Sequence, residues 1–308
     1  MNVTNPKKTV LIVTFPQGGP FVWAQNLAKE LERKNYSIEI VTGRWQYFLA
    51  MFRRCDVLHT CVPLPFSLAK KYVLTIHGNY QEEKAVARPL FRRAIKRAEM
   101  ITVPSEYLKK ILHIPSAKVI PNGINPPSKK KESYTLIDTY PAVGILTNFN
   151  FRRKADGLLY LTKIVHSISS NIQLIIGGSG TSFDEYQKTI LAIHPNTKFL
   201  GHCHKEDLFF KIDVFTYYSN QDNQPIAILE SMAAGLPVLS NQIGAVLEIL
   251  NGKLEKYVSE TDTAYQRTLQ TLLESEESRR DNGSTGIRRS QEFLWEKIIA
   301  QYIEIYGK

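Results

Sequence analysis

The sequence predicts an α/β protein of two domains, each built on a parallel sheet with helices on both faces. Three observations lead to this fold class. Short, nearly continuous apolar runs alternate with helical stretches, which is typical of buried parallel strands. A polar stretch rich in Lys and Pro interrupts the alternation, which then starts again. At 308 residues, with 43% hydrophobic and 22% charged residues, the chain is long enough for two globular domains.

The predicted first domain comprises residues 1–125. Its first strand leads through the loop PQGGP into a helix in which Val22, Leu27 and Leu31 recur at roughly helical spacing. A second helix is expected at 88–98. The strands expected in this domain are 9–15, 36–42, 56–62, 72–78, 100–105 and 118–124.

Residues 126–139 (PPSKKKESYTLIDT) are the predicted linker because they are polar and contain Pro and Lys. The second domain is expected at 140–286, and a C-terminal amphipathic helix at 287–308. Phe293, Ile298, Tyr302 and Ile305 can form the apolar face of that helix, which could pack back across the domains. The elements expected in the second domain are strands 142–149, 172–178, 197–202, 214–219 and 237–240, with helices at about 156–169 and 225–234.

Cysteine content and hydropathy predict the compartment. Three cysteines are too few, and odd in number, for a disulfide framework, which fits a reducing compartment and predicts a cytoplasmic protein. No apolar run reaches the roughly 18 residues of a membrane span, and the N-terminus lacks the pattern of a signal peptide.

Positive charge is concentrated in the first domain. Residues 1–125 carry 19 Lys and Arg against 8 Asp and Glu, a net charge of +11, whereas the rest of the chain has a net charge of −1. This asymmetry predicts that the first domain meets anions. The helix at 88–98 is basic and amphipathic, so it is predicted to contact an anionic membrane surface as a peripheral protein does; the polar back of an ordinary helix is the alternative.

Candidate site residues follow the predicted strands. Two such domains joined by a linker place the carboxyl ends of both sheets around a central cleft, where ligands bind. Gly18 and Gly19 follow the first strand and can let backbone N–H groups approach an anion. His77 ends the strand at 72–78, where it can contact a hydroxyl group. The run 152–154 (Arg, Arg, Lys) follows the first strand of the second domain and suits a diphosphate.

The stretch DNQPIAILESMAAGLPVLS carries two carboxylates, Asp222 and Glu230, on either side of Pro225. Pro225 suits the first turn of a helix, so Asp222 or Asn223 can cap that helix. Glu230 then lies about two turns later, up to roughly 12 Å away. The acid and base of a glycoside hydrolase lie closer, about 5 to 9.5 Å apart. The two carboxylates therefore indicate contacts to two parts of a long ligand, or else a cap and a solvated residue.

Several other site classes are disfavoured. The glycine loop at 177–183 lacks the third glycine and the later acidic residue of a dinucleotide-binding loop, and no phosphate-binding loop of the nucleotide triphosphatases is present. The groupings Cys55, His59, Cys61 and 202–204 (His, Cys, His) lack paired Cys-x-x-Cys ligands, so no metal is expected.

These motifs together resemble family 4 of the glycosyltransferases, retaining enzymes of the GT-B fold that use a nucleotide-sugar donor and no metal cofactor. The resemblance spans nearly the whole chain, through TIHG, ITVPSEYLKKIL, KVIPNGIN, RKADGLLYL, LIIGGSG, FLGH and, most specifically, DNQPIAILESMAAGLPVLSNQIGAVLEI. It implies two Rossmann-like domains that face a cleft. The second domain would bind the donor, and the basic first domain would present the acceptor.

The resemblance also implies roles for individual residues. Asp222 takes the place of the first Glu of the family's Glu-x7-Glu motif and would contact the transferred sugar, while Glu230 would hold the ribose. Lys154 matches the phosphate-binding lysine, with His77 near the transferred sugar. The remaining donor-binding positions implied are Gly18 and Gly19 near the phosphates, Gly201 at the nucleobase, and Asn223 and Ile226 beside Asp222.

This chain departs from the family pattern at three positions. Asn148 replaces the phosphate-binding arginine, so Arg152 or Arg153 is expected to compensate. Pro225 replaces a glycine, and Asp222 is one methylene shorter than Glu. The predicted function is retaining transfer from a nucleotide-diphosphate-sugar to a lipid-linked, saccharide or other hydroxyl acceptor. A non-catalytic nucleotide-sugar-binding protein is the alternative; a nucleic-acid-binding module is less favoured because the basic half lacks a recognisable motif, so no nucleic acid is expected.

Overall fold

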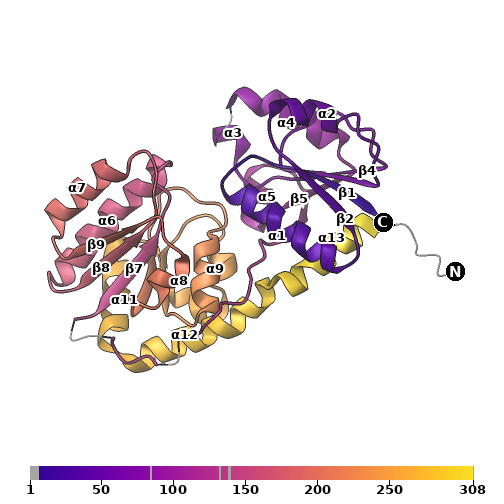
Figure 1. Ribbon diagram of the computed structural model, residues 1–308. Coiled ribbons are helices and arrows are strands. Elements are labelled where there is room, and N and C mark those ends of the chain that lie inside the picture. Colours follow the sequence, from indigo (N-terminus) through magenta and orange to yellow (C-terminus); the bar gives the residue numbers. More distant parts are fainter. Residues whose placement is uncertain (1–6, 84, 132, 138–139, 308) are drawn as a thin grey trace. The chain divides into compact units, whose positions relative to one another are not determined.

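Figure 1 shows the computed structural model, which describes residues 7–83, 85–131, 133–137 and 140–307. The chain divides into two compact units, Met1–Gly123 with Phe293–Lys308, and Ile124–Glu292. The chain therefore leaves the first unit after Gly123 and returns to it at Phe293. This division cuts through the segment 287–308, because residues 287–292 belong to the second unit.

The first unit is built on a six-stranded parallel sheet with the strand order β2-β1-β3-β4-β5-β6. Its central strands are buried on both faces, which explains why their sequences are apolar almost throughout. The strands are β1 (Thr9–Val13), β2 (Ser37–Val41), β3 (Val57–Thr60), β4 (Lys71–Thr75), β5 (Met100–Val103) and β6 (Lys118–Val119).

Helices cover both faces of the first sheet. One core cluster joins it to α1 and α13, and a second joins it to α2, α4 and α5. The elements are α1 (Gly19–Arg33), α2 (Arg44–Ala50), α3 (Tyr80–Glu83), the 3-10 helix η1 (Ala85–Ala87), α4 (Arg88–Arg97), α5 (Glu106–Ile111) and α13 (Trp295–Gly307).

The C-terminal helix α13 packs on α1, although the two are separated by the whole second unit in sequence (Figure 1). The helix expected at 287–308 begins only at Trp295, so Ile298, Tyr302 and Ile305 lie on it while Phe293 precedes it. All four of these residues are at most 4% exposed, as expected for an apolar face. The Trp23 indole N–H donates to the Tyr302 hydroxyl at 3.2 Å. Buried His59 is hydrogen-bonded to the Tyr306 hydroxyl at 2.5 Å and to the Thr75 hydroxyl at 2.6 Å. Burial, together with the charge of His77, lowers the pKa of His59 to about 3, so its neutral ring joins the helix to the sheet.

The second unit repeats this architecture with the strand order β12-β11-β10-β7-β8-β9, again all parallel. The strands are β7 (Ala142–Leu146), β8 (Gln173–Gly177), β9 (Thr197–Gly201), β10 (Val214–Tyr217), β11 (Val238–Asn241) and β12 (Val258–Ser259). The helices are α6 (Arg152–Ile168), α7 (Phe183–Ile193), α8 (Lys205–Phe209), α9 (Ile226–Ala233), α10 (Val246–Ile249), η2 (Gly252–Tyr257), α11 (Asp262–Glu274) and α12 (Glu276–Ser290). The 3-10 helix η3 (Gln291–Phe293) follows, and its last residue already belongs to the first unit.

Helix α6 begins at Arg152, four residues before the start expected from the sequence. The basic triplet continues the helix because Arg and Lys are good helix formers. Lys154 therefore lies in the first helical turn rather than in a loop. The ribbon in Figure 1 shows α6 and α7 together on one face of the second sheet.

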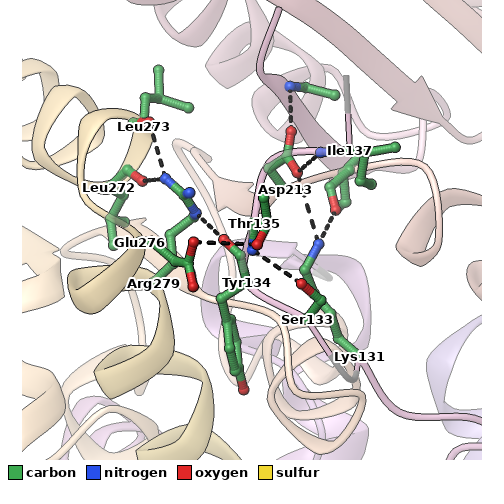
Figure 2. A network of polar contacts seen from close by, with 12 residues as sticks. Lys131, Ser133, Tyr134, Thr135, Ile137, Asp213, Leu272, Leu273, Glu276 and Arg279 are labelled. Carbon is green, nitrogen blue, oxygen red and sulfur yellow. Dashed lines mark hydrogen bonds and ion pairs between the residues drawn. The ribbon is translucent and has the colours of Figure 1, made fainter. Parts of the chain in front are cut away.

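The predicted linker is anchored within the second unit at the residues that the structure describes (Figure 2). The carboxylate of Asp213, which is 1% exposed, accepts hydrogen bonds from the Ile137 N–H at 2.9 Å and the Ala142 N–H at 2.8 Å. Arg279 on α12 donates to the Tyr134 carbonyl at 2.7 Å. The predicted linker is thus attached to the second unit through its backbone, which binds a buried carboxylate and a guanidinium. Residues 132, 138 and 139 lie outside the described residues.

Candidate functional site

Lys154 and Asp222 form an ion pair beyond the carboxyl ends of the neighbouring strands β7 and β10. The Lys154 Nζ lies 2.6 Å from the Asp222 Oδ2, and the side chains are 31% and 10% exposed. Lys154 follows β7 in the first turn of α6, whereas Asp222 lies in the loop between β10 and α9. Gly157 allows α6 to approach β10, because a Cβ there would lie 2.4 Å from the Tyr218 carbonyl oxygen.

The loop that carries Asp222 is held by hydrogen bonds to its backbone. The Ala245 N–H donates to the Asn223 carbonyl at 2.8 Å, and the Asn223 N–H donates to the Asp222 Oδ1 at 2.8 Å. Gly244 has a φ of +54°, and a Cβ there would lie 2.4 Å from the Asp222 carbonyl oxygen. A side chain at position 244 would therefore displace the loop.

Pro225, and not Asp222 or Asn223, is the N-cap residue of α9, so the expected N-cap is wrong. The proline makes no side-chain capping hydrogen bond. The Asp222 carboxylate is bound instead by Lys154 and by its own loop. Ile226 is the first residue of α9, and Gly235, with a φ of +81°, follows its last turn in the left-handed conformation that often ends a helix.

Tyr217 is a residue of this site that the sequence did not single out. It is 5% exposed, and its hydroxyl donates to the Asp222 Oδ2. Burial, followed by the charge of Asp222, raises the pKa of Tyr217 well above its ordinary value, so the hydroxyl stays protonated as a donor. Its place at the end of β10 indicated only a buried strand residue.

We expect Tyr217→Phe to lower the free energy of unfolding by roughly 1.5–3 kcal/mol, the range for a hydrogen bond to a charged group. Urea denaturation measures this change. Tyr218→Phe is the matched control, because its hydroxyl also donates to a carboxylate, that of Asp262, but at an exposed position. Equal losses in the two variants would show that the Tyr217 bond gains nothing from its burial.

Glu230 is also paired rather than simply solvated. The Lys205 Nζ lies 2.5 Å from the Glu230 Oε1, and the side chains are 34% and 23% exposed. Lys205 is the first residue of α8. Sequence reasoning missed it because the two residues lie 25 positions apart in the chain, on different helices.

Gly201 lies at the end of β9 with a φ of +62°, and its carbonyl accepts from the Gly178 N–H at 2.8 Å. Next to it is a cavity of about 340 Å³. The cavity is lined by Leu200, His202, Cys203, His204, Asp207 and Lys211. Within the described residues, no three His, Cys, Asp or Glu side chains gather in a way that could hold a metal ion.

The three cations at 152–154 diverge. Arg152 turns to Glu185 on α7, with 2.5 Å between Nη2 and Oε2 and both side chains exposed. Arg153 is also exposed, and its carbonyl accepts from the Asn220 N–H at 3.2 Å. Of the three, Lys154 is the one whose side chain is bonded to Asp222.

The predicted residues of the first domain lie in the first unit. Gly18 is the N-cap of α1 with a φ of +84°, which favours glycine. Gly19 is the first residue of that helix, and a Cβ there would meet no described atom within 4 Å. His77 follows β4 by two residues, and its ring packs edge-on to Trp23 with 4.8 Å between the centroids.

The fold is that of the GT-B glycosyltransferases. The structure is similar to the sucrose-phosphate synthase from Thermosynechococcus elongatus, with a TM-score of 0.80, 16% sequence identity and 98% of each chain covered. It is also similar to S. aureus TarM in complex with fondaparinux, alpha-GlcNAc-glycerol and UDP, with a TM-score of 0.67 and 14% identity over 82% of this chain and 55% of the other.

The chain belongs to the family described as Glycosyl transferases group 1, whose pattern matches residues 128–289. Residues 44–127 match the pattern described as Glycosyltransferase Family 4. A relative from Bacillus anthracis, N-acetyl-alpha-D-glucosaminyl L-malate synthase, is 25% identical over 84% of this chain and 76% of its own length. The protein is therefore a glycosyltransferase, which confirms the family resemblance and the enzyme class expected from the sequence.

Proposed function

We propose that the enzyme transfers a sugar from a nucleotide-diphosphate-sugar to a hydroxyl acceptor with retention of anomeric configuration. The observation that carries this proposal is the Lys154–Asp222 pair, placed where α6 begins and followed by Glu230 on α9. The N-terminus of α6 and the Lys154 ammonium both favour an anion. A diphosphate there would take over the ammonium from Asp222, whose carboxylate would then accept hydrogen bonds from sugar hydroxyls.

In this proposal the diphosphate leaves from the face of the sugar that the acceptor attacks. The bond from the anomeric carbon to the phosphate oxygen breaks as the acceptor oxygen bonds to that carbon, and the acceptor proton passes to the departing diphosphate. Lys154 stabilises the charge that develops, with Arg152 or Arg153 as a second cation. No protein nucleophile and no metal cofactor take part.

The other predicted residues complete the proposed donor site. Glu230 would bind the ribose after releasing Lys205, and the turn at Gly201 would border the nucleobase. Asn223 and Ile226 would line the sugar pocket beside Asp222. From the basic first unit, Gly18 and Gly19 would approach the phosphates and His77 the transferred sugar, and this unit would present the acceptor.

A donor screen tests the proposal, because a ligand that binds the folded state raises its melting temperature. The sugars to compare are those carried on UDP, GDP and ADP. UDP-N-acetylglucosamine comes first, since the TarM structure contains UDP and the B. anthracis relative is named for N-acetylglucosaminyl transfer. Stabilisation by a donor, with slow release of free nucleotide, supports the enzyme; stabilisation without release supports a sugar-nucleotide-binding protein instead.

We also propose that the enzyme works in the cytoplasm and contacts an anionic membrane through α4. Its five basic residues are all exposed, whereas Phe91 and Ala94 face the core. None of the five forms an ion pair within the part of the chain that the structure describes. The structure does not join the cysteines at positions 55, 61 and 203 to one another by disulfides, as a reducing compartment allows. No helix in the described part of the chain has the length and apolarity needed to span a bilayer.

Neutralising α4 is expected to lower binding to vesicles of phosphatidylglycerol by at least roughly tenfold, since each basic residue near such a surface contributes about 1 kcal/mol. Co-sedimentation measures the change. The variant replaces with Gln the residues Arg88, Arg92, Arg93, Lys96 and Arg97. The control replaces with Gln five exposed basic residues of the second unit, Lys163, Lys188, Lys198, Lys253 and Arg267. Equal sedimentation of the wild type and the α4 variant would remove α4 from the membrane contact.

A further inference from the structure

The segment formed by α2 and the turn after it presents large apolar side chains to solvent. Trp45, Phe48, Leu49 and Phe52, which we call the α2 patch, are 73%, 47%, 48% and 48% exposed. Their spacing is i, i+3, i+4, i+7, the pattern of a helix face that is normally buried. The opposite side of the segment, with Ala50 and Met51, already packs in the core. The α2 patch is therefore a second apolar face.

The three aromatic side chains of the α2 patch are in contact with one another. Trp45 stacks on Phe48 with 5.7 Å between the ring centroids, and Phe48 contacts Phe52 at 5.2 Å. Phe52 in turn meets Phe66 edge-on at 5.2 Å. A contiguous exposed apolar surface of this kind marks an interaction site, whereas singly scattered apolar residues do not.

Exposed arginines flank the α2 patch in the sequence. Between Glu39 and Asp56 the chain has no acidic residue, but it has Arg44, Arg53 and Arg54, which are all exposed. Arg53 pairs with Glu39. Helix α4, with its five exposed basic residues, packs into the same core cluster as α2, and Figure 1 draws both helices on the same side of the first sheet.

We propose that the α2 patch inserts into the headgroup region of an anionic phospholipid bilayer. Aromatic side chains favour that region, and the arginines around them can bind lipid phosphates. A second copy of this chain is a poorer occupant, because two such basic faces would repel each other. Insertion of the α2 patch rests on the proposed membrane contact of α4: α4 would attract the membrane by charge, and the α2 patch would enter it. Neither contact depends on glycosyl transfer.

Trp45 provides a built-in probe of insertion. The chain has three tryptophans, of which Trp23 and Trp295 are 3% and 2% exposed. Emission from the full chain, without donor or acceptor, is measured with vesicles of phosphatidylglycerol and brominated phosphatidylcholine. We expect the bromines to quench Trp45, and the vesicles to shield it from acrylamide. If vesicle-bound protein keeps Trp45 open to acrylamide and unquenched by bromine, the α2 patch does not insert, even where α4 holds the protein on the vesicle.

A double substitution tests the same point by partitioning. Phe48→Ser with Phe52→Ser is expected to weaken vesicle binding about tenfold or more, because two apolar rings no longer leave water. Leu191→Ser with Leu247→Ser is the control, since these side chains of the second unit are 37% and 43% exposed. Thermal unfolding verifies that both variants fold. Unchanged vesicle binding of the Phe variant overturns the proposal. The proposal also fails if the wild type binds no vesicles but forms a dimer in sedimentation velocity that the Phe variant does not form.

Discussion

Lys154→Ala is expected to reduce the turnover of the nucleotide-sugar donor by at least about tenfold, which corresponds to about 1.4 kcal/mol of lost transition-state stabilisation. The Lys154 ammonium lies in the first turn of α6, next to the carboxylate that would face the sugar. In the proposed mechanism its removal takes away the cation that stabilises the departing diphosphate. The turnover rate is measured as the release of free nucleotide from the nucleotide-sugar that stabilises the protein in the donor screen.

Lys163→Ala is the matched control for this experiment, because Lys163 is an exposed lysine later on the same helix. The control should turn over the donor at the wild-type rate. Lys154→Met adds a variant that keeps the length of the side chain without its charge. An unchanged rate in both Lys154 variants would remove Lys154 from the site.

Glu230→Ala is expected to weaken nucleotide binding by roughly tenfold or more, since hydrogen bonds to a charged group contribute about 1.5–3 kcal/mol. Isothermal titration calorimetry with the free nucleoside diphosphate measures the affinity. Glu260→Ala, which removes an exposed carboxylate of the same unit, should bind like the wild type. Unaltered affinity of Glu230→Ala would count against the ribose role.

A weaker affinity must also be traced to the ribose, because Glu230 pairs with Lys205 as well. A thermodynamic cycle does this by comparing how the wild type and Glu230→Ala bind the normal nucleotide and its 2′,3′-dideoxy analogue. If Glu230 binds the ribose hydroxyls, Glu230→Ala has already lost that interaction and binds the two nucleotides with nearly equal affinity. Additive losses would mean that Glu230 acts through Lys205 rather than on the ribose.

Much of the fold was predictable because parallel strands buried on both faces leave a strong local signal. The expected strands at 9–15, 56–62 and 214–219 contain β1, β3 and β10. The two-residue strand β12 was not expected, because so short an edge strand has no periodicity to detect. The start of α6 was misplaced because its cap, Phe151, is not a capping residue.

The candidate site was predictable where chemistry followed a motif. Lys154, Asp222 and Glu230 were each identified by residue type and by position after a strand or within a helix. Their partners were not. Tyr217 reads as a core residue and Lys205 as a solvated one until the structure brings each to its carboxylate.

The fold class, the repeated α/β pattern and the family could be predicted, because they depend on periodicity and motif spacing within short windows of sequence. Only the folded chain shows which charges pair, that α13 returns to the first unit, and that the apolar stripe of α2 faces solvent. An i, i+3, i+4, i+7 stripe is identical in sequence whether a core covers it or not. Only the packing of the rest of the chain determines which side of a helix remains in water.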